Sequence, residues 1–217
     1  MALARLRGAS CVLAAVLAFP LTSIAFETPL SDTAVREAYF LGQRHDLRCL
    51  EAYTKSLPLP AKGPHVAAVT FLTPFAQLVQ RTSNRVENYS AQQAQADHRH
   101  VAESVHLILL INLTPSYGPV ISPGDVSHPD IKPVFRPYDF WKDFSVAAFD
   151  GDQPRHPSEF HGHANSSCGP RGRCSLTGAT LEFTFPAASF ASDTAVIQIA
   201  PPEGDPVTAE FSLTSLR

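Results

Sequence analysis

Residues 180–199 read TLEFTFPAASFASDTAVIQI and contain the two clearest strand patterns of the chain. Apolar and polar residues alternate at 180–185 and again at 194–199, which places the apolar side chains of each run on one face of a strand. A third alternating run covers 207–213, and the turn-rich segment PPEGDP at 201–206 joins it to the second run as a hairpin. The last third of the chain therefore predicts a small antiparallel sheet or sandwich with one solvated face.

The longest strand candidate lies earlier, at 101–113, with the sequence VAESVHLILLINL. Apolar residues occupy every second position from Val105 to Leu113, and Ile108 and Leu110 add apolar residues to the opposite face. One face is expected to be fully buried and the other partly buried, as is typical of a central strand. A shorter apolar run at 66–72 predicts a second buried strand.

Helical signals dominate the first part of the chain. Ser31 is a predicted N-cap, and a second helical run at 46–56 should complete a short α-hairpin before Pro58. Further helix starts are predicted at Thr73, which precedes a proline, and at Ser90, which begins a Ser-x-x-Gln capping box. The pattern predicts an α+β fold with N-terminal helices, a mixed middle and a C-terminal antiparallel β-sheet or sandwich.

A Pro-rich connector at 115–137 separates the mixed part from the β-rich part. It predicts either a boundary between a unit at 26–114 and a β unit at 138–217, or a segment that wraps the surface of one domain. Five aromatic residues lie along and after it: Tyr117, Phe135, Tyr138, Phe140 and Trp141. We expect them to pin the connector onto the β core, or else to line a groove or partner surface.

The first 25 residues have the pattern of an export signal. Arg5 and Arg7 precede an apolar stretch at 9–19, and Ser23-Ile24-Ala25 supplies small residues before a cleavage point. The apolar stretch is too short to cross about 30 Å of hydrocarbon. Residues 1–25 are therefore predicted to be a signal peptide, and residues 26–217 a single exported α+β domain. Abundant proline and an excess of arginine over lysine favour a bacterial source, so the expected location is periplasmic or secreted.

Charge and hydropathy exclude several classes of partner. The chain has a net charge of −3, and removing the signal peptide takes away two arginines and no acid. A mildly acidic chain without a basic block disfavours nucleic-acid binding. No segment after the signal peptide approaches the roughly 20 apolar residues of a membrane helix. An envelope protein is the class of partner that the predicted location favours.

Three cysteines remain after the signal peptide. Cys168 and Cys174 flank the turn-rich sequence GPRGR, and in an oxidising compartment this spacing predicts a disulfide. Cys49 falls on the predicted second helix, where a buried and inert thiol is the expected state. Pairing of Cys49 between two molecules is the alternative.

The segment 150–174 concentrates residue types that bind metals. His161 and His163 would point to one side of an extended segment, and His156 could add a third ligand, a set that suits zinc or copper. The spacing matches no established metal motif, so the alternative is a polar surface loop fixed by its disulfide. A second group, His98, His100, Glu103 and His106, is expected to be a solvated polar segment.

Common catalytic motifs are missing from the sequence, which contains no Gly-x-Ser-x-Gly, His-Glu-x-x-His or Walker loop. The function that the sequence favours is a non-enzymatic exported protein that acts as a binding or interaction module. The alternatives are a metal-handling protein or metalloenzyme that uses the His-rich segment, and an enzyme whose site spans both parts of the chain.

Overall fold

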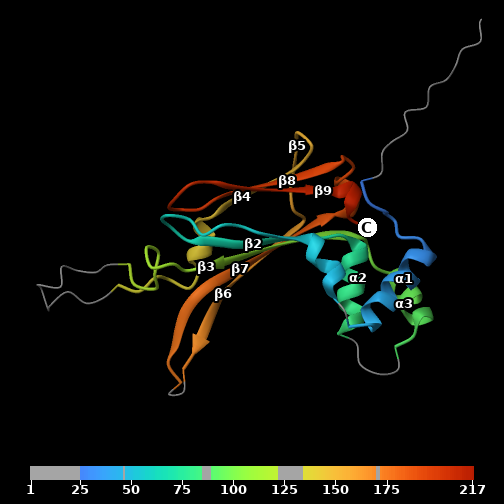
Figure 1. Cartoon of the computed structure of the whole chain (residues 1–217), viewed down its shortest axis with the longest axis horizontal. Helices are drawn as coiled ribbons and strands as arrows, with labels where there is room; N and C mark the ends of the chain where they lie inside the picture. The colour runs from blue at the N-terminus through green and yellow to red at the C-terminus, as the bar shows by residue number, and fades with distance from the viewer. Residues whose placement is uncertain (1–24, 46, 85–88, 122–133, 170–171) are drawn as a thin grey trace, which may run out of the picture.

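The computed structural model describes residues 25–45, 47–84, 89–121, 134–169 and 172–217. The predicted signal peptide lies outside the described residues except for Ala25, as do residues 122–133 of the connector. Two antiparallel sheets are packed face to face, and a helical unit lies at one end of the larger sheet (Figure 1). None of the described helices is both long and apolar enough to cross a membrane.

The larger sheet has the strand order β1-β2-β3-β7-β6. Its strands are β1 (Thr54–Ser56), β2 (His65–Leu72), β3 (Ser104–Asn112), β6 (Glu159–Cys168) and β7 (Cys174–Pro186). The central strand is β3, as the pattern at 101–113 predicts, and it pairs with β7 from Ser104 opposite Pro186 to Asn112 opposite Gly178. Strands from before and after the connector therefore share one sheet.

The smaller sheet has the order β5-β4-β8-β9 and comes entirely from the last third of the chain. Its strands are β5 (Gln153–Arg155), β4 (Ser145–Asp150), β8 (Thr194–Ala200) and β9 (Val207–Ser212). The alternating runs at 194–199 and 207–213 become β8 and β9, which confirms the predicted C-terminal antiparallel sheet.

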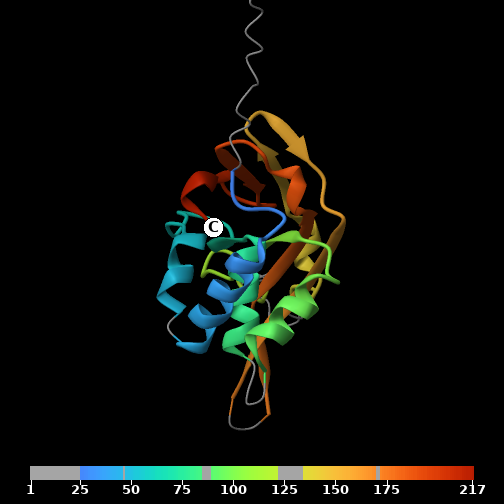
Figure 2. The ribbon, with the colours of Figure 1, turned by 90° about the vertical axis from the view of Figure 1, so that its right-hand side faces the viewer.

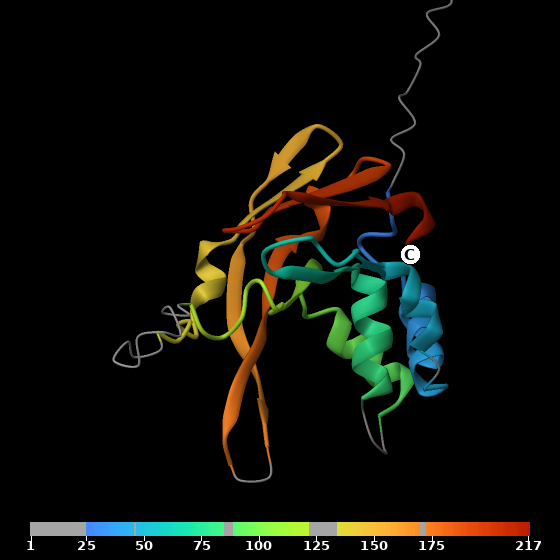
Figure 3. The same ribbon diagram turned by 60° about the vertical axis from the view of Figure 1, so that its left-hand side comes forward.

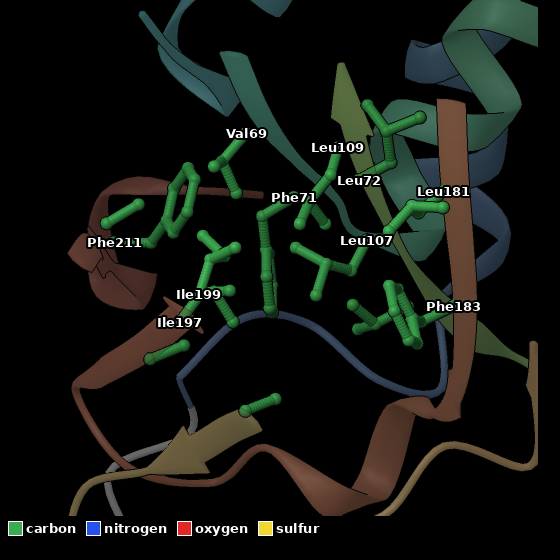
Figure 4. Close-up of a cluster of buried hydrophobic side chains, with 14 of the residues drawn as sticks. Val69, Phe71, Leu72, Leu107, Leu109, Leu181, Phe183, Ile197, Ile199 and Phe211 are labelled. Carbon is green, nitrogen blue, oxygen red and sulfur yellow. The ribbon is translucent and has the colours of Figure 1, made fainter. Parts of the chain in front are cut away.

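The main hydrophobic core fills the space between the two sheets (Figure 4). The ring of Phe71 on β2 stacks on Phe211 of β9 with 5.4 Å between ring centroids, and it meets Phe190 edge-on at 5.1 Å. Leu107 and Ile197 are fully buried in the same layer. Burial of each such side chain stabilises the fold by roughly 1.5–3 kcal/mol. The alternating patterns give each sheet one apolar face, and the two sheets bury these faces against each other.

The helical unit, which faces the viewer in Figure 2, has a small hydrophobic core of its own. It contains α1 (Asp32–Gln43), α2 (Pro74–Ser83) and α3 (Ala91–His98). The three predicted N-caps are confirmed, because the hydroxyls of Ser31, Thr73 and Ser90 each accept a hydrogen bond from a backbone amide of the first turn. Short 3₁₀ turns complete the chain: η1 (Leu47–Tyr53), η2 (Phe140–Asp143), η3 (Ala187–Ser189) and η4 (Leu213–Ser215).

The prediction of a second helix at 46–56 is wrong. After α1, His45 takes a positive φ of 53°, and the chain continues as the 3₁₀ turn η1 and then as β1. Thr54 pairs with Thr70 on β2, and the buried Tyr53 exchanges hydrogen bonds with the backbone of Arg217. Pairing with distant parts of the chain therefore outweighs the local helical pattern.

The sequence WKDFSVAAF at 141–149 also predicts a strand, which begins later than expected. Residues 140–143 form the turn η2, in which Phe140 is buried beside Tyr117, and strand β4 starts only at Ser145. The aromatic residues at this position pack individually into the core, so their spacing is not that of a strand.

The segment 150–174, predicted as a surface loop, is mostly β structure. It supplies β5 and β6, and β6 pairs with β7 from Glu159 opposite Thr184 to Cys168 opposite Cys174. Most of β6 is exposed because it is an edge strand, so it carries no alternating pattern that the sequence could reveal. The far end of this hairpin, residues 165–169 and 172–178, projects beyond the sandwich and is called here the β6–β7 arm (Figure 1).

Candidate functional site

The two histidines at the centre of the predicted metal segment lie on β6. His161 and His163 are two residues apart on one exposed face, with Glu182 opposite the first and Thr180 opposite the second. The Nε2 atom of His161 lies 3.9 Å from a carboxylate oxygen of Glu159. Both of these side chains are largely exposed, so the contact adds little stability.

The third predicted ligand, His156, lies on a different segment. It follows β5 in the connection to β6, and its side chain is exposed. Among the residues that the structure describes, no three His, Cys, Asp or Glu side chains lie close enough together to hold a metal ion. The structure thus brings His161 and His163 onto one face without completing a ligand set, and the zinc or copper site stays a prediction.

The acidic group at the start of this segment has a structural partner. The carboxylate of Asp150 is buried, and it accepts hydrogen bonds from Arg155 at 2.8 Å and from the amides of Ala191 and Ser192. Burial by itself would raise the pKa of Asp150, but these hydrogen bonds outweigh it and hold the pKa below its usual value. Asp150 therefore ties β4 to the loop before β8.

The predicted disulfide is present. Cys168 and Cys174 form a disulfide at the far end of the β6–β7 arm. The two residues are six positions apart in the sequence. Contrary to the expected buried state, the side chain of Cys49 on η1 is exposed. A 3₁₀ turn has three residues per turn instead of 3.6, so the face that an α-helix would bury is displaced around the axis.

The polar group around His98 is more buried than expected. The Nε2 atom of His98 lies 2.8 Å from Oε1 of Glu103, and the side chains of these two residues are only 14% and 10% exposed. Glu103 also accepts hydrogen bonds from the hydroxyl of Thr28 and the amide of Leu30, both at 2.6 Å. No local pattern could have predicted these partners, because Thr28 lies 75 positions away in the sequence.

The described ends of the connector form a two-stranded ribbon. Val120 bridges Phe135, Ile121 donates a backbone hydrogen bond to Val134, and Arg136 donates one to Pro119, both at 2.8 Å. Residues 119–121 and 134–136 are called here the connector ribbon, which lies at the end of the molecule opposite the helices (Figure 3).

The aromatic residues around the connector fall into two groups. Tyr117 and Phe140 are buried, and the guanidinium of Arg136 lies 3.3 Å from the centroid of the Tyr117 ring, so these residues anchor the connector. Phe135 and Tyr138 are 69% and 62% exposed. The expectation that aromatic rings pin the connector is therefore confirmed for Tyr117 and Phe140. A groove or partner surface at Phe135 and Tyr138 stays a prediction.

The described residues define an α+β protein with two packed antiparallel sheets, a helical unit, the β6–β7 arm and the connector ribbon. Comparison with models of known protein families and with curated proteins found no match to this chain.

Proposed function

We propose that this chain is an exported, non-enzymatic binding protein that holds a protein partner of the cell envelope through the connector ribbon. The observation that carries the proposal is the concentration of exposed apolar side chains there. Ten large apolar side chains of the described residues are exposed. Four of them belong to the connector ribbon, Val120, Ile121, Val134 and Phe135, and a fifth, Tyr138, follows it closely. Contiguous apolar surface on a protein is typical of an interaction site.

The ribbon is also held in place before any partner arrives. At its base, the side chain of Arg136 donates a hydrogen bond from Nε to the carbonyl of Gly118 and covers the ring of the buried Tyr117. A surface that is already ordered loses less conformational entropy on binding. Aromatic side chains such as Phe135 and Tyr138 also supply a large share of binding energy at protein interfaces.

Two features support export. The predicted signal peptide ends at Ala25, and the ring of Phe26, which the mature chain would keep, is buried in the main core. The disulfide of the β6–β7 arm is of a kind that persists in oxidising compartments. N-terminal sequencing of the protein from the envelope fraction should give Phe26 as the first residue, whereas intact protein in the cytosol would contradict export.

A photo-cross-linking residue tests the binding surface in native cells. Placed at Phe135, it should give a discrete adduct with one envelope protein after irradiation. The matched control is the same residue at Phe40, which is 53% exposed on α1, outside the ribbon. Adducts of equal yield at both positions, or no adduct at Phe135, would contradict the proposal.

The second candidate is a metal-handling protein, favoured by the shared exposed face of His161 and His163. Two imidazoles at this spacing suit zinc or copper as a pair of ligands. Calorimetric titration of the metal-free protein with Zn²⁺ and Cu²⁺ tests this function. Binding that His163→Ala abolishes and His100→Ala leaves intact would support it, and the same affinity in both variants would exclude it.

A further inference from the structure

A small pocket lies where α2, the end of α3 and the beginning of β3 meet. It has a volume of 140 Å³, and its lining includes Arg81, His98, Glu103, Ser104 and His106. At about 30 Å³ per water molecule, such a volume accepts a ligand group of a few heavy atoms. Figure 1 places α2 at the end of the molecule away from the connector, so the pocket is separate from the connector ribbon.

The charge of Arg81 is not compensated in this pocket. Within residues 25–45, 47–84, 89–121, 134–169 and 172–217, its guanidinium makes no hydrogen bond or ion pair. Glu103 is the acid in the pocket lining, and both of its oxygens are already occupied by His98, Thr28 and the amide of Leu30. A carboxylate held in this way competes poorly for Arg81, which therefore keeps its five donors available.

Two further polar side chains point to the same side of β3. Ser104 and His106 are two residues apart on the strand, so they share a face, and both are half-buried. In the described part of the chain, neither side chain makes a hydrogen bond. The side-chain Nε2 of Gln77 donates hydrogen bonds to the carbonyls of Leu72 and Ser104, which fixes α2 against this end of β3.

The state of His106 follows from the groups that face it. Burial lowers the pKa of His106, with Arg81 acting in the same direction from α2. Glu182 on β7 and Glu159 on β6 act in the opposite direction, but burial outweighs them. The imidazole is therefore neutral near pH 7 and offers one N–H donor and one acceptor.

We propose that this pocket is a binding site for a small oxyanion, a carboxylate or phosphate group, held by Arg81, His106 and Ser104. Arg81 would supply the charge and two parallel N–H donors, a geometry that matches both groups. The imidazole N–H and the hydroxyl would bind a remaining oxygen. The pocket is too small for more than the anionic end of a larger molecule, so the rest of the ligand would extend into solvent.

The test uses NMR of the mature chain labelled with ¹⁵N, observed at the histidine rings and the arginine Nε–H groups. Sodium acetate and sodium phosphate are added in separate titrations at fixed pH, with sodium chloride of equal ionic strength as the reference. The signals of His106 and Arg81 should shift and saturate with a dissociation constant on the order of 1 mM. Saturation with acetate alone, phosphate alone or both identifies which oxyanion the site accepts.

Arg81→Gln should weaken this binding at least about tenfold, because it removes the charge-assisted hydrogen bonds. Arg44→Gln is the matched control, since Arg44 is exposed at the end of α1 and the change in net charge is the same. Unchanged thermal unfolding of both variants would show that they are folded. Equal loss of binding in the two variants, or shifts that chloride reproduces, would overturn the proposal.

Discussion

The indole ring of Trp141 lies against the backbone of Gly162, so closely that a β-carbon on this glycine would be 2.6 Å from ring carbons Cε3 and Cζ3. Trp141 follows the connector, and Gly162 lies on the edge strand β6. Phe160 extends the contact, because it meets Trp141 edge-on and stacks on Phe183 with 4.6 Å between centroids. The end of the connector is thereby fastened to the edge of the larger sheet.

We predict that Gly162→Val lowers the free energy of unfolding by about 1–3 kcal/mol, because the new side chain must displace the indole. Trp141 is the only tryptophan in the chain, so its fluorescence reports this site directly. Its emission should move to longer wavelength as the ring becomes exposed. Gly169→Val is the control, since a β-carbon there comes no closer than 3.8 Å to its neighbour. Unchanged emission in Gly162→Val would contradict the packing.

Asp150→Asn should lower the free energy of unfolding by about 2 kcal/mol at pH 7, because the hydrogen bonds to Arg155 and to two amides lose their negative acceptor. The pKa of Asp150 is lowered in the folded state, so its ionised form stabilises the fold above the pKa of an unfolded aspartate, about 3.9. That stabilisation is lost as the pH falls through the lower folded pKa.

Chemical unfolding of the wild type and of Asp150→Asn, measured from pH 7 down to about pH 3, checks this pH dependence. The difference between the two proteins should be constant above pH 5 and shrink below about pH 4. A difference that grew on acidification would show that the ionised carboxylate does not stabilise the fold.

Glu103→Ala should release the segment before α1. The variant removes the acceptor for Thr28, Leu30 and His98, and the expected loss in unfolding free energy is about 2–3 kcal/mol. Hydrogen exchange at the amide of Leu30 should accelerate more than exchange at β8. Glu210→Ala, an exposed position on β9, is the control and should change neither quantity. Protection of Leu30 that persists in Glu103→Ala would show that Glu103 does not hold this segment in place.

The parts of the fold that the sequence predicts are those with a local cause. The N-caps at Ser31, Thr73 and Ser90 depend on one side chain and one nearby amide, and the buried strands β2, β3, β8 and β9 follow from their apolar spacing. Strand β6 was not predicted, because an edge strand exposed on both faces has no reason to alternate.

The candidate sites show the same division. The spacing of Cys168 and Cys174 was sufficient to predict their disulfide, and the spacing of His161 and His163 their common face. The connector ribbon could not be predicted, because Val120 and Phe135 meet in an isolated bridge that no local pattern indicates. The pocket could not be predicted either, because Arg81 on α2 and His106 on β3 are distant in the sequence and neither belongs to a recognisable motif.

Replacing both Cys168 and Cys174 by serine should lower stability by at most about 2 kcal/mol, the loop-closure entropy of so small a ring. Because the β6–β7 arm projects from the sandwich, the effect should be local. Hydrogen exchange should accelerate at 166–169 and 172–176 and stay unchanged in β3. Faster exchange throughout β3 would show instead that the disulfide supports the whole larger sheet.

The double variant Val134→Ser, Phe135→Ser should separate binding from folding. These side chains are 54% and 69% exposed, so their truncation removes little packing and opens no cavity. The unfolding free energy should therefore change by no more than about 0.5 kcal/mol. A partner that covers the ribbon would lose the burial of a valine and a phenylalanine, a loss of about 3 kcal/mol or more in binding. Affinity for the cross-linked envelope partner, measured by calorimetry, should therefore fall at least about a hundredfold. Phe40→Ser removes another exposed ring, from α1, and should leave the affinity intact, since α1 lies at the other end of the molecule (Figure 1). If the double variant bound as tightly as the wild type, the apolar side chains of the ribbon would not be the contact surface.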